Sequence, residues 1–276
     1  MLSATVLRKD LKSISKVIEP KMPFINSFLL ESAGATVTMP SVSVDFSMDM
    51  SGSFVKIPTF GRSASGFQAV EVSSPSAKSK SLSFSVMPTE TQSTNRIVAL
   101  LVTAYLNGKG TINSVSYGGQ AFTRAIATVS TNDKGSAEIW YGVVPTNPAS
   151  NTVTITASEN IVRVRICREI LLGMTSSTPY DTDVSKEGSE DFATMVINHP
   201  TNGVSLGTCI IWKDGITAVS ATWTNVTESD ETNGHDDPVA FSSAYYESSI
   251  ASVRGIRCEW TGISDANVEI AGASWR

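Results

Sequence analysis

After residue 80 the chain consists of short runs that fit β-strands, separated by residues that favour turns. One run, "RIVALLVTAYL" (96–106), is apolar on both faces, as expected for a central strand covered on both sides. In several other runs apolar and polar residues alternate, which is the pattern of a strand with one buried face. Many short strands with regular turns are typical of β-sandwiches and barrels, so the sequence predicts an all-β fold. The alternating runs include "SLSFSV" (81–86), "NTVTITAS" (151–158), "NIVRVRICRE" (160–169) and "ANVEIAGASW" (266–275).

Two adjacent glycines, Gly118 and Gly119, lie between strand-like runs in "SVSYGGQAFT" (114–123). A two-residue turn of type I′ needs a positive φ at both central residues, which glycine adopts without steric cost. A phosphate-binding loop would need a helix directly after the glycines, whereas the β-branched residues that follow favour a strand. The pattern therefore predicts a hairpin that joins strands near 112–117 and 120–128.

The first 66 residues follow a different pattern. Apolar residues spaced by three or four positions within residues 3–18 predict a short amphipathic helix, which Pro20 ends. The alternation that follows predicts a strand, and "GRSASG" (61–66) fits a flexible joint. We expect an N-terminal arm over 1–66 and a β-sandwich domain over 75–276. The apolar face of the helix consists of Leu7, Leu11, Ile14 and Ile18.

Composition limits the partners of the chain. Charged residues make up 17% of the 276 residues and the formal net charge is −5, so no general affinity for nucleic acid is expected. No apolar run approaches the ~20 residues of a membrane span. The opening "MLSATVLRKDLKSISKV" has charges where a secretory signal would be apolar. We therefore expect neither nucleic acid nor a membrane as partner.

The three cysteines, Cys167, Cys209 and Cys258, are widely spaced and stand in apolar or alternating runs. No CxxC pair is present, so no zinc site is predicted. Buried free thiols are the simpler interpretation, and they suit a reducing compartment.

The order of the elements resembles a known domain. The apolar strand precedes "VSYGGQAFTRAIATVSTNDKGSAEIWYGVVPTNPASNTVTITAS" (115–158), and "TSSTPYDTD", "VSATWTNVTESDE", "AFSSAYYES" and "VEIAGASW" follow. This order is similar to that of a jelly-roll-like β-sandwich domain that recurs in tailed-phage virion proteins and in some large bacterial surface proteins. The resemblance covers residues 80–276. It implies a surface or assembly module that is not tied to one reaction.

The histidines and carboxylates carry no clear catalytic signature. His199 and His235 stand in turn-like sequences, where histidines are usually solvated, and no G-x-S-x-G motif is present. Asp181 and Asp183 in "PYDTD" are two residues apart, and turn formation is a simpler role for them than paired-carboxylate catalysis. We therefore expect no enzyme activity and no cofactor.

An acidic loop, "ESDETNGHDD" (228–237), is a candidate calcium-binding site, because calcium takes several oxygen ligands. Its residues do not fit the ligand positions of an EF-hand, so an exposed acidic loop tip is the simpler interpretation. An irregular site built from its acids stays open as the alternative: Asp230, Glu231, Asp236 and Asp237.

Two features suggest surface contacts. Arg163, Arg165 and the nearby Arg168 could form a basic stripe for an acidic partner, or could pair with cross-strand acids on a solvated face. Trp260 alternates in register with apolar residues and is expected in the core. Trp223 is the better candidate for an exposed ring that stacks on a sugar.

The function expected from the resemblance is that of a non-enzymatic structural protein of a tailed-phage particle, assembled in the host cytoplasm. Within that class a capsid decoration or cement protein is favoured, with other virion proteins and further copies of the chain as partners. The alternatives are a tail, neck or fibre component, and a carbohydrate-binding module that adsorbs to host glycan. The residues expected to attach the arm to neighbouring subunits are Leu7, Leu11, Ile14, Ile18, Phe24, Phe28 and Leu29.

Overall fold

The chain divides into two units, Met1–Thr59 and Phe60–Arg276. In the first unit the structure, a computed structural model, describes one antiparallel pair, β1 (Phe46–Met48) and β2 (Phe54–Lys56). The predicted helix over 3–18 and all seven arm residues expected to attach to neighbours lie outside the described residues. The described ranges are 46–48, 54–56, 61–62, 68–73, 79–85, 96–128, 134–144, 152–213, 216, 219–232 and 239–276.

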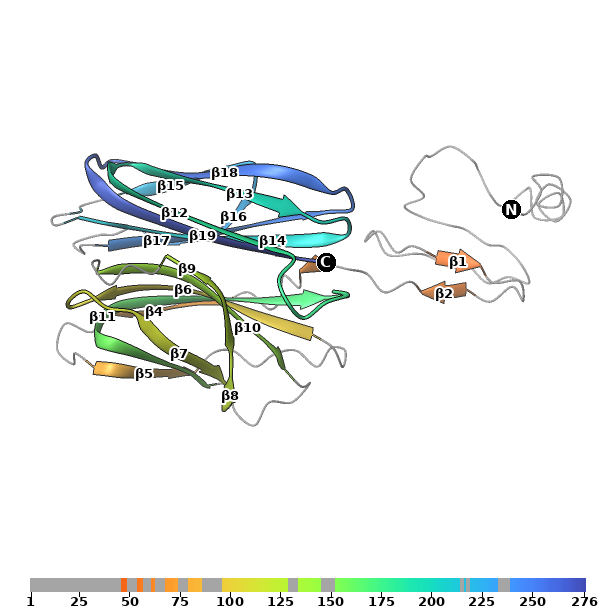
Figure 1. The fold of residues 1–276 in the computed structure, drawn as a ribbon, viewed down its shortest axis with the longest axis horizontal. Helices are drawn as coiled ribbons and strands as arrows, with labels where there is room; N and C mark the ends of the chain where they lie inside the picture. Colours follow the sequence, from red (N-terminus) through yellow and green to blue (C-terminus); the bar gives the residue numbers. More distant parts are fainter. Residues whose placement is uncertain are drawn as a thin grey trace, which may run out of the picture. The chain divides into compact units, whose positions relative to one another are not determined.

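The second unit is all-β in its described residues, and every strand pairing in it is antiparallel. Its strands form two halves that lie against each other (Figure 1). The first half contains β3 (Gly61–Arg62), β4 (Gln68–Ser73), β5 (Ser79–Ser85), β6 (Arg96–Leu106), β7 (Ile112–Tyr117), β8 (Gln120–Ala121), β9 (Thr123–Ala127), β10 (Gly135–Val144) and β11 (Thr152–Leu172). The second half contains β12 (Asp181–Glu190), β13 (Phe192–His199), β14 (Gly203–Trp212), β15 (Ser220–Thr224), β16 (Thr227–Thr232), β17 (Val239–Ser248), β18 (Ser252–Thr261) and β19 (Ala266–Trp275).

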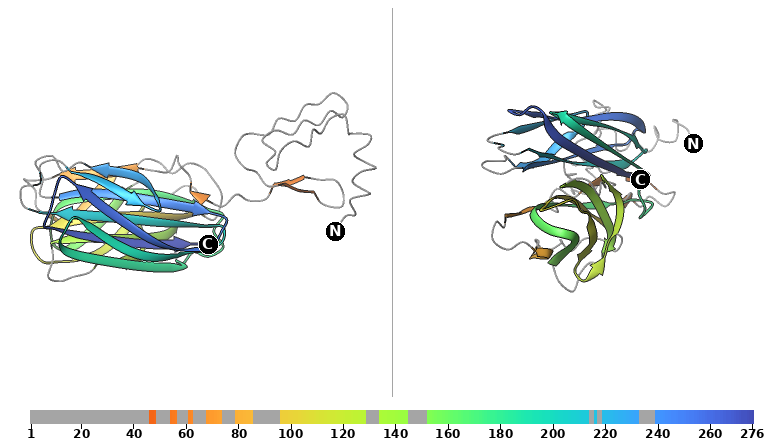
Figure 2. Two further views of the ribbon diagram at one scale, coloured as in Figure 1. Left: turned by 90° about the horizontal axis from the view of Figure 1, so that it is seen from above. Right: turned by 60° about the vertical axis from the view of Figure 1, so that its left-hand side comes forward.

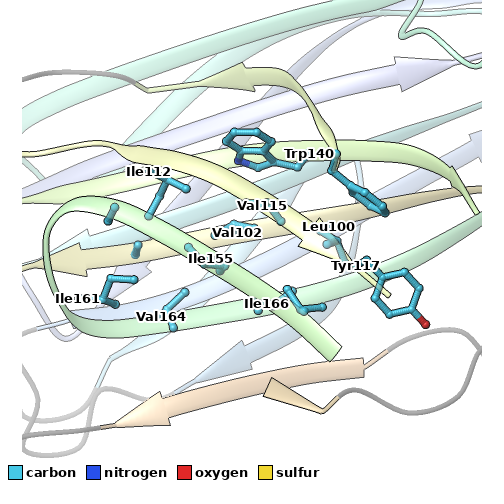
Figure 3. Packing of buried hydrophobic residues seen from close by; sticks show 14 of the residues in the cluster. Leu100, Val102, Ile112, Val115, Tyr117, Trp140, Ile155, Ile161, Val164 and Ile166 are labelled. Carbon is cyan, nitrogen blue, oxygen red and sulfur yellow. The ribbon is translucent and has the colours of Figure 1, made fainter. Parts of the chain in front are cut away.

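The first half is one nine-stranded sheet that folds over on itself at β11. The early part of β11 pairs with β5 and β7, and its later part pairs with β3, β4 and β6. The pairing register shifts between Thr156 and Ile161, where the strand bends. As a result Ile155 from the early part of β11 and Ile166 from its later part face one core (Figure 3).

The second half consists of two facing sheets, an arrangement compatible with a β-sandwich. The middle sheet has the order β12-β19-β14-β17-β16, and the outer sheet has the order β13-β18-β15. Alternation along each strand sends every second side chain into the space between them, which is the core of this half. Large members of that core include Met195, Trp223, Ile256 and Trp260.

The two halves share a continuous apolar interface. Along β6, Val98 and Leu100 face the core of the first half, whereas Ile97 and Leu101 face the second half. This double coverage explains why the run is apolar on both faces, and it confirms the prediction of a central covered strand. The middle sheet contributes Val204, Leu206, Ala273 and Trp275 to the same interface.

The layering differs from the single sandwich expected over 75–276. The sheets lie in successive layers through the second unit (Figure 2), because β6, β10 and the late part of β11 bury their second face against the middle sheet. The expected joint over 61–66 contains β3, which pairs with β11, and β4, which precedes the expected start of the sandwich at residue 75, pairs with the same strand.

The predicted glycine hairpin is confirmed. Gly118 and Gly119 have φ angles of 60° and 83°, and Tyr117 pairs with Gln120 across the turn. The partner strand is split into β8 and β9, and Phe122 between them is buried against Tyr117 with ring centroids 6.1 Å apart.

Candidate functional site: the outer face of β13 and β18

Three exposed aliphatic side chains lie at one end of the outer sheet. Val196 in β13 is 54% exposed, Val253 in β18 is 70% exposed, and Ile250 in the turn before β18 is 72% exposed. Val253 pairs with Asn198, and Val196 pairs with Gly255, so the two valines are diagonal neighbours on one face. We call Val196, Ile250 and Val253 the aliphatic patch.

The rest of this outer face is polar. β15 contributes small hydroxyl residues, because its alternate residues Ala221 and Trp223 point into the core. In β18, Arg257 lies 3.7 Å from the centre of the Phe192 ring and donates to Glu259 over 3.1 Å. The aliphatic patch is therefore bordered by polar and paired charged groups, as at the rim of many protein contacts.

The free edge of β13 is covered by two aspartates. The amide of Val196 donates to Asp183 over 2.7 Å, and the amide of Asn198 donates to Asp181 over 2.7 Å. Both aspartates lie in β12 rather than in a turn, so their predicted role as turn formers is wrong. They occupy the donors that another strand would otherwise pair with, which protects the edge from strand addition.

His199 lies beside this edge and is buried, with 2% of its surface exposed. Its Nε2 is 3.3 Å from the Ser248 carbonyl, which can only accept, so Nδ1 accepts from the Ser205 hydroxyl at 2.8 Å. The ring also packs edge-on against Tyr246, with centroids 4.7 Å apart. The expectation of a solvated histidine is therefore wrong, and burial lowers the pKa of the imidazole.

The Ser205–His199 pair does not form an accessible nucleophilic site. Ser205 is 1% exposed, and Nε2, the nitrogen that faces the nucleophile in a Ser-His-Asp triad, is bonded to a carbonyl. The pair joins β13, β14 and β17 at the end of the second half, which is a structural role.

Glu269 is a fully buried carboxylate between the halves. It accepts a hydrogen bond from Thr128 of the first half, and its Oε1 lies 3.7 Å from Lys186 Nζ. Burial raises the pKa of Glu269 to about 7, although the Thr128 hydroxyl and the Lys186 ammonium oppose the shift. This carboxylate therefore changes its charge near neutral pH.

Glu138 is a second fully buried carboxylate, inside the first half, and both of its oxygens accept hydrogen bonds. It accepts from Ser136 Oγ over 2.6 Å and from Trp140 Nε1 over 2.8 Å, and Arg124 Nε lies 3.2 Å away. Burial raises the pKa of Glu138, and these three partners oppose the shift. With its acceptors occupied by protein groups, Glu138 stabilises the core and is not placed to bind a ligand.

Trp223 is buried, so its predicted role as an exposed sugar-stacking ring is wrong. It is 9% exposed, and its Nε1 donates to Ser242 Oγ over 2.7 Å. The signal was present in "SATWT" (220–224), where Ala221 and Trp223 alternate with hydroxyl residues in the same way that Cys258 and Trp260 alternate in β18. Trp260 is in the core as predicted.

Arg165 of β11 faces the second half rather than solvent, since it is 5% exposed and pairs with Asp230 of β16. Arg168 is fully buried and lies on the opposite face of β11, which it shares with Val164 and Ile166 of the first half's core. Arg163 is half-buried. The predicted surface contact is therefore wrong for Arg165, because the middle sheet covers the face of β11 on which it lies.

Part of the acidic loop is described. Glu228 accepts from Ser242 Oγ over 3.1 Å, and burial raises its pKa. Glu231 accepts from the amide of Ala221 over 3.0 Å. His235, Asp236 and Asp237 lie outside the described residues. Among the residues that the structure describes, no three His, Cys, Asp or Glu side chains are grouped in a way that could hold a metal ion.

No protein-family model matches the sequence, and no curated protein matches it either. Within the described ranges, no helix has the length and apolar character needed to cross a membrane.

Proposed function

We propose that the protein is a non-enzymatic structural component of a tailed-phage particle, acting as a capsid decoration or cement protein. The observation that supports this most directly is the aliphatic patch on the outer face of the second half. A particle component must present apolar surface to its neighbours, and exposed apolar groups with a polar rim are typical of protein contacts. The buried carboxylates, by contrast, are hydrogen-bonded within the protein.

The strand order of the second half supports the jelly-roll part of this proposal. A jelly roll is a double sheet built from two Greek keys. In the second half the order β12-β19-β14-β17 faces β13-β18-β15, so successive strands repeatedly cross between the sheets. This support applies to residues 181–275.

In this proposal the N-terminal arm, including its predicted helix, attaches the protein to other virion proteins and to further copies of itself. The arm carries many apolar residues for its length, and arms of this kind gain stability by lying on adjacent subunits. The protein would then reach the virion during assembly in the host cytoplasm.

The test is reconstitution on purified particles that lack the protein. Full-length chain, a 60–276 truncation, and the double variant Val196→Asp/Val253→Asp are added, and bound copies per particle are counted by quantitative mass spectrometry. We expect hundreds of copies for the full chain and strong losses for the other two. Thr222→Asp/Thr224→Asp, on the same outer face but in β15, is the matched control and should bind normally.

A handful of copies per particle would favour the tail, neck or fibre alternative. Undiminished binding by both the truncation and the valine variant would overturn the attachment surfaces proposed here. Failure of the full chain to bind any phage particle would overturn the proposed function.

A further inference from the structure

Two of the three thiols face each other across the core of the second half. Cys209 lies in β14 of the middle sheet, and Cys258 lies in β18 of the outer sheet. Both are fully buried, and both belong to the core between these two sheets. They are far apart in sequence but come from the two sheets that enclose one core.

The contacts around the thiols place them within reach of each other. Trp260, two residues after Cys258 on the same face of β18, donates its indole N–H to Cys209 Sγ over 3.4 Å. Burial raises the pKa of the Cys258 thiol, and the neighbouring Cys209 thiol raises it further. Trp223 pairs in register with Cys258 in the outer sheet and belongs to the same core.

We infer that Cys209 and Cys258 are the site of an inter-sheet disulfide, formed when a peroxide oxidises the folded protein. A disulfide needs two β-carbons on opposing elements that point toward each other at short range. Cys209 and Cys258 point into one core from its two facing sheets, and Trp260, the neighbour of Cys258 on the same face, reaches Cys209 Sγ. Immunoglobulin domains have a bridge of this kind packed against a tryptophan, so a sandwich core can accommodate one.

The chemistry balances with the peroxide as the oxidant. The thiolate of one cysteine attacks a peroxide oxygen, the O–O bond breaks, and a sulfenic acid and one water form once the leaving oxygen is protonated. The second thiol then attacks the sulfenic sulfur, the S–O bond breaks and a second water leaves. In sum, two thiols and one hydrogen peroxide give one disulfide and two waters.

Cys167 provides an internal control because it lies on the other side of the middle sheet. It is buried in the interface between the halves, and Ser243 Oγ donates to its Sγ over 3.3 Å. The middle sheet therefore separates Cys167 from the Cys209–Cys258 pair.

Burial sets the rate of the reaction. The thiolate is the reactive form, and burial in apolar surroundings disfavours it, so oxidation should require local opening of the outer sheet. Oxidation is expected to be slow in the native protein and faster in mild denaturant. The bridge, once formed, connects the outer sheet to the middle sheet and should raise the melting temperature.

The experiment uses the full chain, purified with a reductant and then incubated with hydrogen peroxide. Thiols are counted in denaturant before and after, and peptides are mapped by mass spectrometry without reduction. We expect three reactive thiols before oxidation, one afterwards, and a linked peptide pair containing Cys209 and Cys258. Cys167→Ser should still form the linked pair, and Cys209→Ser and Cys258→Ser should each abolish it.

Three reactive thiols after prolonged oxidation would overturn the inference, as would a linked pair that contains Cys167. So would sulfinic acid on Cys209 or Cys258 in place of the bridge. If a serine variant does not fold, the peptide map of the wild-type chain decides the question by itself.

Discussion

Arg165 of β11 and Asp230 of β16 form an ion pair that connects the two halves of the large unit. The two side chains are 6% and 20% exposed, so water screens the pair only weakly. Removing one partner of such a pair leaves the other charge buried.

We predict that Arg165→Met lowers the free energy of unfolding by about 3–5 kcal/mol, the range found when one partner of a buried pair is removed. The double variant Arg165→Met/Asp230→Leu should recover part of that loss because no unpaired charge remains. Equilibrium urea unfolding of the wild type, Arg165→Met, Asp230→Leu and the double variant gives a double-mutant cycle for the pair. Simple additivity of the two single effects would argue against a direct interaction.

The turn glycines allow a test of backbone conformation alone. A Cβ at Gly119 would meet no atom within 4 Å, so a substitution there is strained only by its φ of 83°. Gly119→Val should cost about 1–2 kcal/mol of unfolding free energy. Gly119→Asn should cost less, since asparagine tolerates positive φ better. Equal losses for valine and asparagine in thermal unfolding would contradict this explanation.

Glu269 should make the protein less stable as pH rises toward neutrality. Its pKa in the folded state is about 7, against 4.5 for an ordinary glutamate, so the folded state binds the proton more tightly. The associated stability is fully present below pH 4.5 and is lost as pH rises through 7, by about 3 kcal/mol at 1.36 kcal/mol per pKa unit. Glu269→Gln should remove this dependence when its stability is measured against pH and compared with the wild type. Parallel curves for the two proteins would show that Glu269 does not titrate in this window.

His199 should make the protein less stable as pH falls, which is the opposite of the effect of Glu269. Burial lowers the pKa of its imidazole below the ordinary 6.5, so the unfolded chain binds the proton more readily. The stability it contributes is present above pH 6.5 and is lost as pH falls through the pKa of the folded state. NMR titration should show one imidazole, absent from His199→Gln, with a pKa below 6.5. A value above 6.5 for that resonance would contradict the buried, neutral state.

The start of the folded unit can be tested by truncation. Residues 68–73 pair with Arg163–Arg168 of β11, and Gly61–Arg62 pairs with Leu171–Leu172. A 60–276 chain should therefore melt near the temperature of the full-length protein. A 75–276 chain should melt several degrees lower, because it loses two strands from the edge of β11. Identical melting temperatures for the two truncations would show that β3 and β4 add little stability.

Local features were predictable because their causes are local. The hairpin at Gly118–Gly119 follows from the φ angles that only glycine adopts freely, and the strand at 96–106 follows from apolar residues on both faces. Burial of the three cysteines, which are unbridged, followed from their apolar neighbours. In each case a few adjacent residues contain the necessary information.

The tertiary structure decided what covers each face. A period of two shows which side chains of β11 share a face, but it does not show whether that face meets water or another sheet. Arg165 and Trp223 were therefore expected at the surface, although the middle sheet covers Arg165 and the outer sheet encloses Trp223. Likewise, only the packing of β12 against β13 made Asp181 a partner of a strand edge. The sequence by itself determined the all-β class, the covered strand at 96–106 and the glycine turn, whereas the order of the layers depended on long-range contacts between residues far apart in the chain.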